Sequence, residues 1–193
     1  MYNSWLSSKY LDYRPILLEK SLPEGVLRVQ AVLQAAGHST VPRMLDDAAR
    51  TAQQAADALG IAVGQIAKSI IFRRTSDDAA VLVVTSGDRR VDEAKVAALV
   101  CSVGAKLGRA DAEFVKTKTG FAIGGVAPVG HSTAPVTLVD RELFRFATVW
   151  AAAGHPHAVF EISPADLQAL CNAPVADVAQ QAHNASAINY IAN

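Results

Sequence analysis

The sequence predicts one domain of the α/β or α+β class, in which strands and helices are mixed along the chain. Its 193 residues suit a single domain, alone or with a short appendage, and are enough to bury a good core. Hydrophobic residues make up 51% and charged residues 19%, which excludes a disordered chain, and the longest apolar runs are far too short to span a bilayer. Helical and strand-like periods alternate, and the late strands follow one another closely, as in hairpins.

The N-terminal part of the chain divides into an extension and two helices. Residues 1–20 show no sustained periodicity and lack the charged-then-apolar order of a signal peptide, so a cytoplasmic protein is expected. A capping box at 21–24 precedes apolar residues at helical spacing and predicts a helix over 22–36. A second capping box at 51–54 predicts an alanine-rich helix that Gly60 ends.

Two strands are expected at the centre of the sheet. Residues 64–72 follow a two-residue period, and residues 79–86 form a nearly continuous apolar run that is typical of a strand buried on both faces. A polar turn over 73–78 separates them. One face of the first strand carries Ile66, Lys68, Ile70 and Phe72.

The remaining elements follow from caps and periodicity. A helix over 91–103 is expected to turn an apolar stripe inward, formed by Val96, Leu99, Val100 and Val103. Asp111 caps a short helix that ends near Gly120. Three more strands are expected over 135–140, 147–152 and 157–162, with a short helix or turn over 140–146 and a last helix that Ser163 opens. The expected division is an extension over 1–20, a domain over 21–178 and a tail over 179–193.

A lysine on an apolar strand face is the first candidate for chemistry. Burying an uncompensated ammonium group is costly, so Lys68 must reach solvent at a strand end or meet an anion or backbone carbonyls. The neighbouring Ser69 has no base that the sequence identifies, so a serine nucleophile has no support. A snorkelling lysine and a functional lysine both remain open at this point.

A glycine-rich loop over 119–131 is the second candidate. Residues 120–130 include four glycines and Pro128, which rules out an ordinary helix or strand interior. Such a loop offers its backbone N–H and C=O groups to a ligand. The alternative interpretation is a glycine-rich corner between two strands.

These stretches carry a family resemblance. The chain resembles the YbaK/prolyl-tRNA editing-domain family of aminoacyl-tRNA deacylases, through IAKSIIF, SGDRRVDEAKVA, TGFAIGGVAPVGH, LVD and AAGHPHAVFEIS in the family's order. The resemblance runs from about Ala48 to Leu170. It implies a mixed, barrel-like sheet of about six or seven strands flanked by helices. It also implies hydrolysis of the ester between a wrong amino acid and its tRNA, without a cofactor.

The resemblance also implies which residues form the site. Lys68 stands at the family's lysine position, and 125–130 at its G-x-x-P-x-G loop. The catalytic residues expected from it are Lys68, Gly125, Pro128 and Gly130. The residues expected to bind substrate are Gly124, Val126, Ala127, His131, Gly154 and His155.

Charge and cysteine content bear on partners and cofactors. Eighteen basic residues balance eighteen acidic ones, which argues against a protein that holds nucleic acid by bulk charge, and so against a DNA-binding protein. A transient contact with the acceptor end of a mischarged tRNA is still allowed, through local pairs at Arg73-Arg74, Arg89-Arg90 and Lys116/Lys118, and an aminoacyl-tRNA synthetase is a further candidate partner. Neither membrane nor metal is expected, because the histidines lack metal-site spacing. Cys101 and Cys171 are expected to be buried free thiols.

Three functions remain open from the sequence. In a deacylase, Lys68 would orient the terminal ribose-phosphate or polarise the ester, while the loop backbone would hold the aminoacyl group and a water or ribose hydroxyl. A module of the same fold could instead bind tRNA or a synthetase without hydrolysis. A lysine-dependent carbonyl enzyme, with Lys68 as a Schiff-base nucleophile, is the third.

Overall fold

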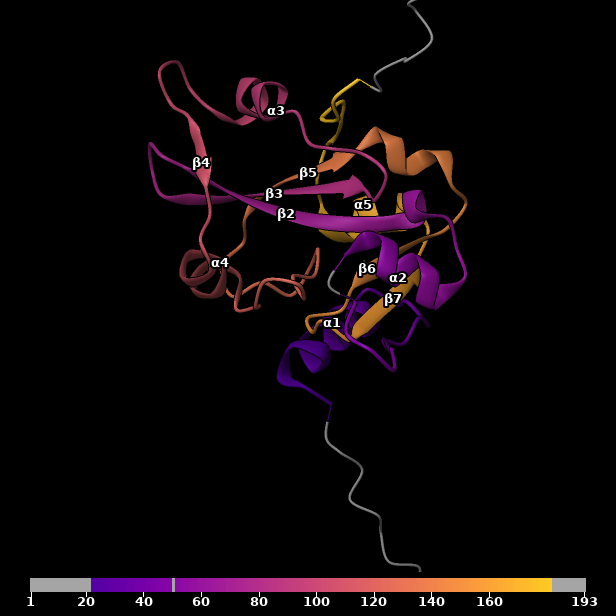
Figure 1. Cartoon of the computed structure of the whole chain (residues 1–193). Coiled ribbons are helices and arrows are strands. Elements are labelled where there is room, and N and C mark those ends of the chain that lie inside the picture. The colour runs from indigo at the N-terminus through magenta and orange to yellow at the C-terminus, as the bar shows by residue number, and fades with distance from the viewer. Residues whose placement is uncertain (1–21, 50, 182–193) are drawn as a thin grey trace, which may run out of the picture.

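A mixed sheet built around two long strands organises the chain (Figure 1). The structure is a computed structural model that describes residues 22–49 and 51–181. Strands β2 (Ile66–Arg74) and β3 (Ala79–Ser86) pair antiparallel from Ala67–Ser86 to Arg74–Ala79. The strand order is β1-β7-β6-β2-β3-β5-β8, with β4 also paired to β2, so the two strands lie at the centre as the sequence predicts.

The other elements flank this pair. The helices are α1 (Glu24–Ala35), α2 (Ala52–Leu59), α3 (Glu93–Val100), α4 (Ala112–Thr119) and α5 (Pro164–Cys171), with short 3₁₀ turns η1 (Val63–Gln65) and η2 (Arg141–Arg145). The other strands are β1 (Arg43–Met44), β4 (Leu107–Arg109), β5 (Val136–Asp140), β6 (Val149–Ala152), β7 (Ala158–Ile162) and β8 (Val175–Ala176).

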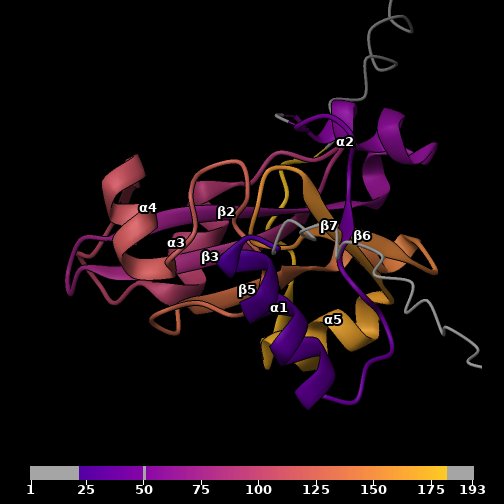
Figure 2. The same cartoon turned by 90° about the horizontal axis from the view of Figure 1, so that it is seen from below.

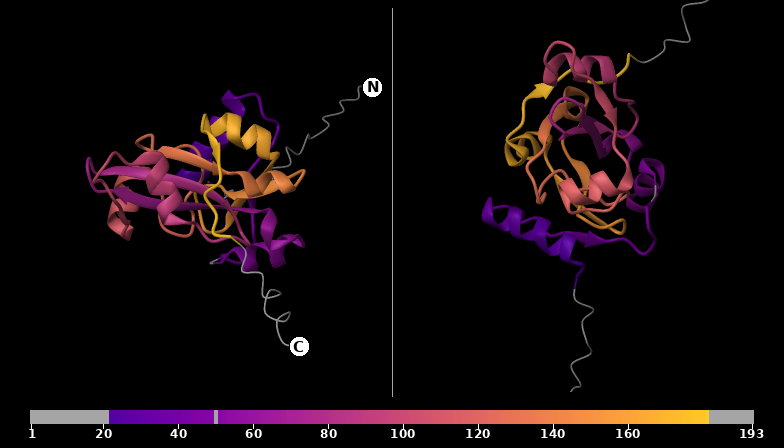
Figure 3. Two further views of the ribbon diagram at one scale, coloured as in Figure 1. Left: turned by 90° about the horizontal axis from the view of Figure 1, so that it is seen from above. Right: turned by 90° about the vertical axis from the view of Figure 1, so that its left-hand side faces the viewer.

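The sheet curls, and its two faces bury separate clusters. Seen along the long strands, the sheet forms an open barrel (Figure 3, right). The larger cluster joins Leu82 and Val84 of β3 to α1 and α5 through Val29 and Leu167. In Figure 2, these two helices lie on one side of the sheet. The smaller cluster packs α3 against the other face through Val96. The predicted α/β domain with a mixed, barrel-like sheet is confirmed.

The helix caps explain where most helices begin. Thr51 accepts a hydrogen bond from the Gln54 N–H at 3.1 Å, and Gly60 ends α2 with a φ of 67°, as expected. Asp111 caps α4 in the same way, by accepting from the Phe114 N–H at 2.8 Å. Helix α1 differs from expectation, because its N-cap is Pro23 and no side chain caps it. Ser21, the predicted cap, lies outside the described residues.

The helix predicted over 91–103 is shorter in the structure, and fewer of its apolar residues face inward than predicted. Helix α3 ends at Val100, so Val103 lies in the following turn and is fully exposed. Leu99 is 56% exposed, because the helix turns Val96 and Val100, four residues apart, toward the sheet. The prediction of Leu99 and Val103 as inner residues is therefore wrong.

The sheet has eight strands within the described residues, against the predicted six or seven. Three of them, β1, β4 and β8, are only two or three residues long and carry too short a pattern to show a period. Near the end of the described chain, Ala179 bridges to Val91, and the Gln180 N–H donates to the Arg90 carbonyl at 2.8 Å. The boundaries at 21 and 178 remain a prediction. None of the described helices has the length and hydropathy needed to cross a membrane.

Candidate functional site

The two edges of β2 are paired differently. One edge is paired with β3 at every residue from Ala67 to Arg74. On the other edge, β6 pairs with Ile66 and Ala67, and β4 pairs with the three residues from Phe72 to Arg74. Within the described residues, no strand pairs with 68–71 on that edge. A four-residue gap in the sheet therefore leaves backbone groups of β2 available to a ligand.

A pocket of about 380 Å³ opens along this gap. All six β2 residues from Ile66 to Ile71 line it, whereas a pocket over one face of a strand would meet alternate residues. Among the wall residues that the structure describes, Lys68 is the one lysine or arginine, and no carboxylate is present. The rest of the wall comes from Ala49, Thr51, Ala52, Ala55, Ala110, Val115, Ile123, Gly124, Val126, Trp150, Ala151, Ala152, His155, Pro156, Ala158 and Val159.

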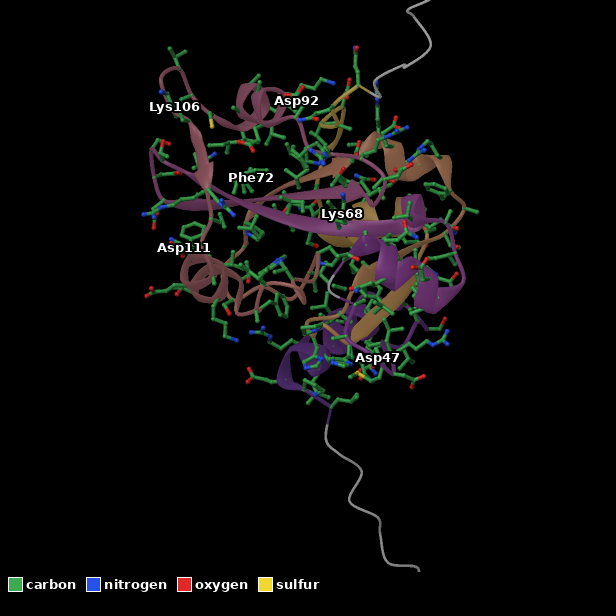
Figure 4. All side chains as sticks on the ribbon, in the orientation of Figure 1. Asp47, Lys68, Phe72, Asp92, Lys106 and Asp111 are labelled. Carbon is green, nitrogen blue, oxygen red and sulfur yellow. The ribbon has the colours of Figure 1, made fainter. Side chains whose placement is uncertain are left out.

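Lys68 is half-buried and lies near the middle of the molecule, while Phe72 lies further along β2 toward β4 (Figure 4). The Lys68 Nζ donates a hydrogen bond to the carbonyl of Arg89 at 2.6 Å. Burial is the largest cause that lowers the pKa of the Lys68 ammonium from its ordinary value of 10.5. The negative charge of Asp88 acts against this and raises the pKa, whereas the positive charge of Arg90 lowers the pKa further. No carboxylate of the described residues lies within salt-bridge distance of Nζ. The ammonium group is thus partly dehydrated and lacks an ion-pair partner.

The glycine loop reaches the pocket at its start. Gly124, with a φ of 91°, and Val126 line the wall. Gly125 lies behind them, against the turn that carries His155. A Cβ built on Gly125 would lie 2.7 Å from the His155 carbonyl carbon and 2.9 Å from the Pro156 nitrogen, so only glycine fits. The requirement at Gly125 is therefore close backbone packing rather than a positive φ.

The later loop residues support the loop from behind. His131 places Nε2 2.8 Å from the Ala127 carbonyl, and burial lowers its pKa, so the neutral ring donates this hydrogen bond. The Pro128 carbonyl accepts from the thiol of Cys171 at 3.6 Å. Gly130 has a φ of 76° but an open Cβ position, with no atom nearer than 3.6 Å. These residues, Ala127 to His131, do not line the pocket.

The turn after β6 completes the wall. His155 lines the pocket, and its Nδ1 accepts from the His157 N–H at 3.2 Å. Gly154 does not line the pocket. It has a φ of 83°, and a Cβ there would overlap the backbone of Gly25 in α1, so the turn packs directly on that helix.

The structure thus separates the ten predicted site residues into two groups. Lys68, Gly124, Val126 and His155 meet at one pocket, whereas the remaining six, Gly125, Ala127, Pro128, Gly130, His131 and Gly154, lie behind its walls.

Sequence reasoning missed part of this wall. The Ser69 hydroxyl is buried and has no hydrogen-bond partner among the described residues, although an isolated buried hydroxyl costs about 1–3 kcal/mol. The alanines of α2 and β6 that line the pocket carry no chemical signal in the sequence. Only the proximity of α2 to β2 in the fold shows that they face the same space.

Neither cysteine reaches this site. Both are free thiols, as expected, but partly rather than fully buried. Burial raises the pKa of Cys171 to about 12, which keeps it protonated. Within residues 22–49 and 51–181, no group of three His, Cys, Asp or Glu side chains is arranged to hold a metal ion.

Known proteins resemble this chain over most of its length. Residues 46–170 match the profile of the aminoacyl-tRNA editing domain. The uncharacterized protein YwhH of Bacillus subtilis (strain 168) is 35% identical over 117 residues, which make up 61% of this chain and 72% of that protein. The crystal structure of a candidate trans-editing enzyme for prolyl-tRNA synthetase superposes with a TM-score of 0.76 and 41% identity, over 83% of this chain and all of that one. Hypothetical protein APE2540 superposes with a TM-score of 0.72 and 30% identity, over 79% of this chain and 99% of that one.

The profile covers more than half of the chain, and it includes the lysine strand, the glycine loop and the His155 turn. The resemblance predicted from the five motifs is therefore confirmed. The chain belongs to the aminoacyl-tRNA editing domain family.

Proposed function

We propose that this protein is an aminoacyl-tRNA deacylase that acts in trans, in the cytoplasm, and hydrolyses the ester between a wrong amino acid and its tRNA. The observation that carries the proposal is the Lys68 ammonium, which has no ion-pair partner among the described residues and lies in a pocket whose other described wall residues are uncharged or neutral, at the gap in β2. The likeness to a candidate trans-editing enzyme supports action on a tRNA charged by another protein.

The pocket suits the aminoacyl end of such a substrate. Its volume is of the size that takes a small ligand, and its wall of alanines, Val126 and Trp150 would receive an uncharged amino-acid side chain. The backbone groups of 68–71 that do not pair within the sheet would bind the polar atoms around the ester. Among the described residues of the wall, no charged side chain other than Lys68 competes for these atoms.

In the proposed reaction, water attacks the carbonyl carbon of the ester and negative charge develops on the carbonyl oxygen. Lys68 stabilises this charge, because an ammonium group held by the Arg89 carbonyl in a partly dehydrated site needs little reorganisation. The bond from the carbonyl carbon to the ribose oxygen then breaks, and the ribose oxygen takes up a proton. The products are the free amino acid and a tRNA with an intact 3′ end.

The predicted loop residues act in this proposal through position. Gly124 and Val126 contact the aminoacyl group, and Gly125 lets the loop pack against the His155 turn. Pro128, Gly130, Ala127 and His131 fix the loop from behind, and Gly154 seats the His155 turn on α1. A shift of about 1 Å in such a support can cost roughly 100-fold in rate.

A panel of tRNAs, each charged with a wrong amino acid, tests the proposal. We expect hydrolysis of at least one esterified tRNA, and a loss of at least about 100-fold in Lys68→Ala, the scale of one preorganised charge-stabilising group. Lys95→Ala is a matched control, because the Lys95 ammonium also donates to a backbone carbonyl, that of Ala179 at 2.8 Å, but is paired with Asp177. Wild-type rates in folded Lys68→Ala would remove Lys68 from the mechanism.

The same panel separates the alternatives. A binding module without activity would bind acylated tRNA and hydrolyse none of it. A Schiff-base enzyme would form an imine between Nζ and a carbonyl substrate with loss of water, and borohydride would reduce the imine to a stable secondary amine on Lys68. We expect no such adduct with an ester substrate.

A further inference from the structure

A second pocket of about 550 Å³ adjoins the first. The two share four wall residues, namely Lys68, Ile70, Ile71 and Ala110. The first pocket continues from Lys68 toward α2 and β6, and the second continues toward β4 and the segment after β3. Lys68 therefore lies where the two pockets meet.

The second pocket is positively charged. Besides Lys68, its wall contains Arg89, Arg90 and Arg109, against the carboxylate of Glu93 as the single one among the described wall residues. Among residues 22–49 and 51–181, no arginine lines the first pocket. An anionic group is thus favoured on one side of Lys68 and an uncharged group on the other.

Two of these arginines are available to a ligand. Arg89 is paired with Glu142 at 2.9 Å, and its carbonyl accepts from Lys68. Arg90 and Arg109 are exposed and form no salt bridge within the part of the chain that the structure describes. By contrast, Arg73, Arg74 and Lys118, from the other basic pairs of the sequence, are tied to Asp77 and Asp78.

We propose that this second pocket binds the 5′-phosphate of the 3′-terminal nucleotide of aminoacyl-tRNA, through Arg90 and Arg109. The identity of the nucleotide rests on the proposed function. The aminoacyl group is attached at the 2′ or 3′ oxygen of the terminal ribose, and the 5′-phosphate leaves from the other end of the same sugar. A ribose at Lys68 with its amino acid in the apolar pocket therefore directs its phosphate away from that pocket.

The chemistry of the wall fits such a group. The planar fork of a guanidinium matches two phosphate oxygens, and an exposed arginine pair can close on a phosphate from two sides. Ile70, Val91 and Phe72 form an apolar surface beside the arginines, against which the sugar or base can pack. Recognition of a phosphate and a sugar is independent of base sequence, which suits an enzyme that meets a common 3′ end.

Binding of AMP, compared with adenosine, tests the subsite without any hydrolysis. By titration calorimetry at low salt, we expect AMP to bind the full chain at least about tenfold more tightly than adenosine, the scale of one charge-assisted contact pair. In the double variant Arg90→Gln/Arg109→Gln, the ratio of the two affinities should fall toward one. Arg43→Gln is the control, because Arg43 is also exposed but lies on β1 at the far end of the strand order.

Each outcome decides the proposal. Equal affinities for AMP and adenosine in the wild type, or an unchanged ratio in the double variant, would overturn it. Inorganic phosphate should bind more weakly than AMP, and equal affinity for the two would overturn the assignment to a nucleotide. If AMP binds through the arginines but no mischarged tRNA is hydrolysed, the subsite stands and the proposed function fails. If tRNA is hydrolysed but the phosphate adds no affinity, the proposed function stands and the subsite fails.

Discussion

The two edges of β2 differ in how completely they are paired. Along the edge that faces β3, every residue from Ala67 to Arg74 has a partner, and β3 is buried along almost its whole length. Along the other edge, pairing stops after Ala67 and resumes at Phe72, and the two pockets open there. The continuous edge fixes the position of the strand, so the interrupted edge can leave its backbone groups and Lys68 to a ligand.

This contrast predicts that changes on the two edges have separable effects. A substitution on the β3 side should reduce the free energy of unfolding and leave the rate of the folded protein unchanged. A substitution at the gap should reduce the rate and change the free energy of unfolding little.

The largest effect is expected on the continuous edge. Leu82 of β3 is fully buried in the larger cluster, so Leu82→Ala should lower the free energy of unfolding by about 2–5 kcal/mol through lost burial and a cavity. Denaturant unfolding measures this, and deacylation is assayed at a temperature where the variant is folded. A variant of normal stability, or a folded variant with a rate near that of Lys68→Ala, would break the contrast between the edges.

Gly125→Ala should have the next largest effect, which is a loss of rate in the folded protein. The added Cβ would meet the backbone of His155 and Pro156, which cannot move aside as a flexible side chain can, so the pocket wall must shift. We expect a loss of roughly 100-fold in deacylation. In Gly130→Ala the added Cβ has open space around it, so the substitution adds only backbone strain of about 1 kcal/mol. Its deacylation rate should therefore fall less than that of Gly125→Ala.

Ser132→Ala is the control for this pair, because Ser132 is exposed and its hydroxyl accepts only a long hydrogen bond from Arg28 at 3.3 Å. If Gly130→Ala is the more damaged variant, a positive φ rather than close packing governs the loop. If both glycine variants are near wild type, the loop does not position the substrate.

His131→Ala should have a moderate effect on stability. It removes the hydrogen bond to the Ala127 carbonyl and the edge-to-face contact with Phe121, together worth about 1–2 kcal/mol. Deacylation should fall less than in Gly125→Ala, because His131 does not line the pocket. Thermal melts and rates of the two variants measured side by side check this order. A dead His131→Ala with a normal melt would instead place the imidazole in the chemistry.

The smallest effect concerns the pH dependence of stability. Burial lowers the pKa of Lys68 in the folded protein, so between that pKa and 10.5 the unfolded chain binds more protons and stability rises with pH. At neutral pH the charged group opposes folding. Lys68→Met should therefore be slightly more stable than wild type at pH 7, and the difference should shrink as pH approaches 10.5. A variant that is less stable at pH 7, or a difference that grows with pH, contradicts the assignment of a dehydrated ammonium.

Periodicity and caps predicted the parts of the fold that depend on neighbouring residues. The central strands, α2 and α4 fall where the apolar runs, Thr51 and Asp111 place them. The strand β4 could not be predicted, because its three residues are strand only through their pairing with β2. The exposure of Leu99 likewise depends on where the sheet lies relative to α3, which the apolar spacing of one helix does not specify.

The candidate site was predicted in part. The sequence identifies Lys68 because a charged residue on an apolar strand face is costly unless it has a polar partner. The closely spaced glycines likewise predict a loop that approaches other backbone. The sequence does not show that Gly125 and His131 lie behind the pocket and not in its wall. It also does not show that Arg90 and Arg109, which are 19 positions apart and on different elements, face one space beside Lys68.

The gap in β2 also bears on how the protein avoids self-association. Unpaired strand edges are templates for pairing with another chain, and proteins usually protect them with charge, proline or coverage. Here the free stretch is only four residues long, about 13 Å at the usual rise per residue, and β6 and β4 close it at both ends. An incoming strand would be blocked at either side, whereas a short ligand would fit. The protein can thus present backbone hydrogen-bonding groups to a ligand with little risk of offering an edge to which a second copy could add a strand.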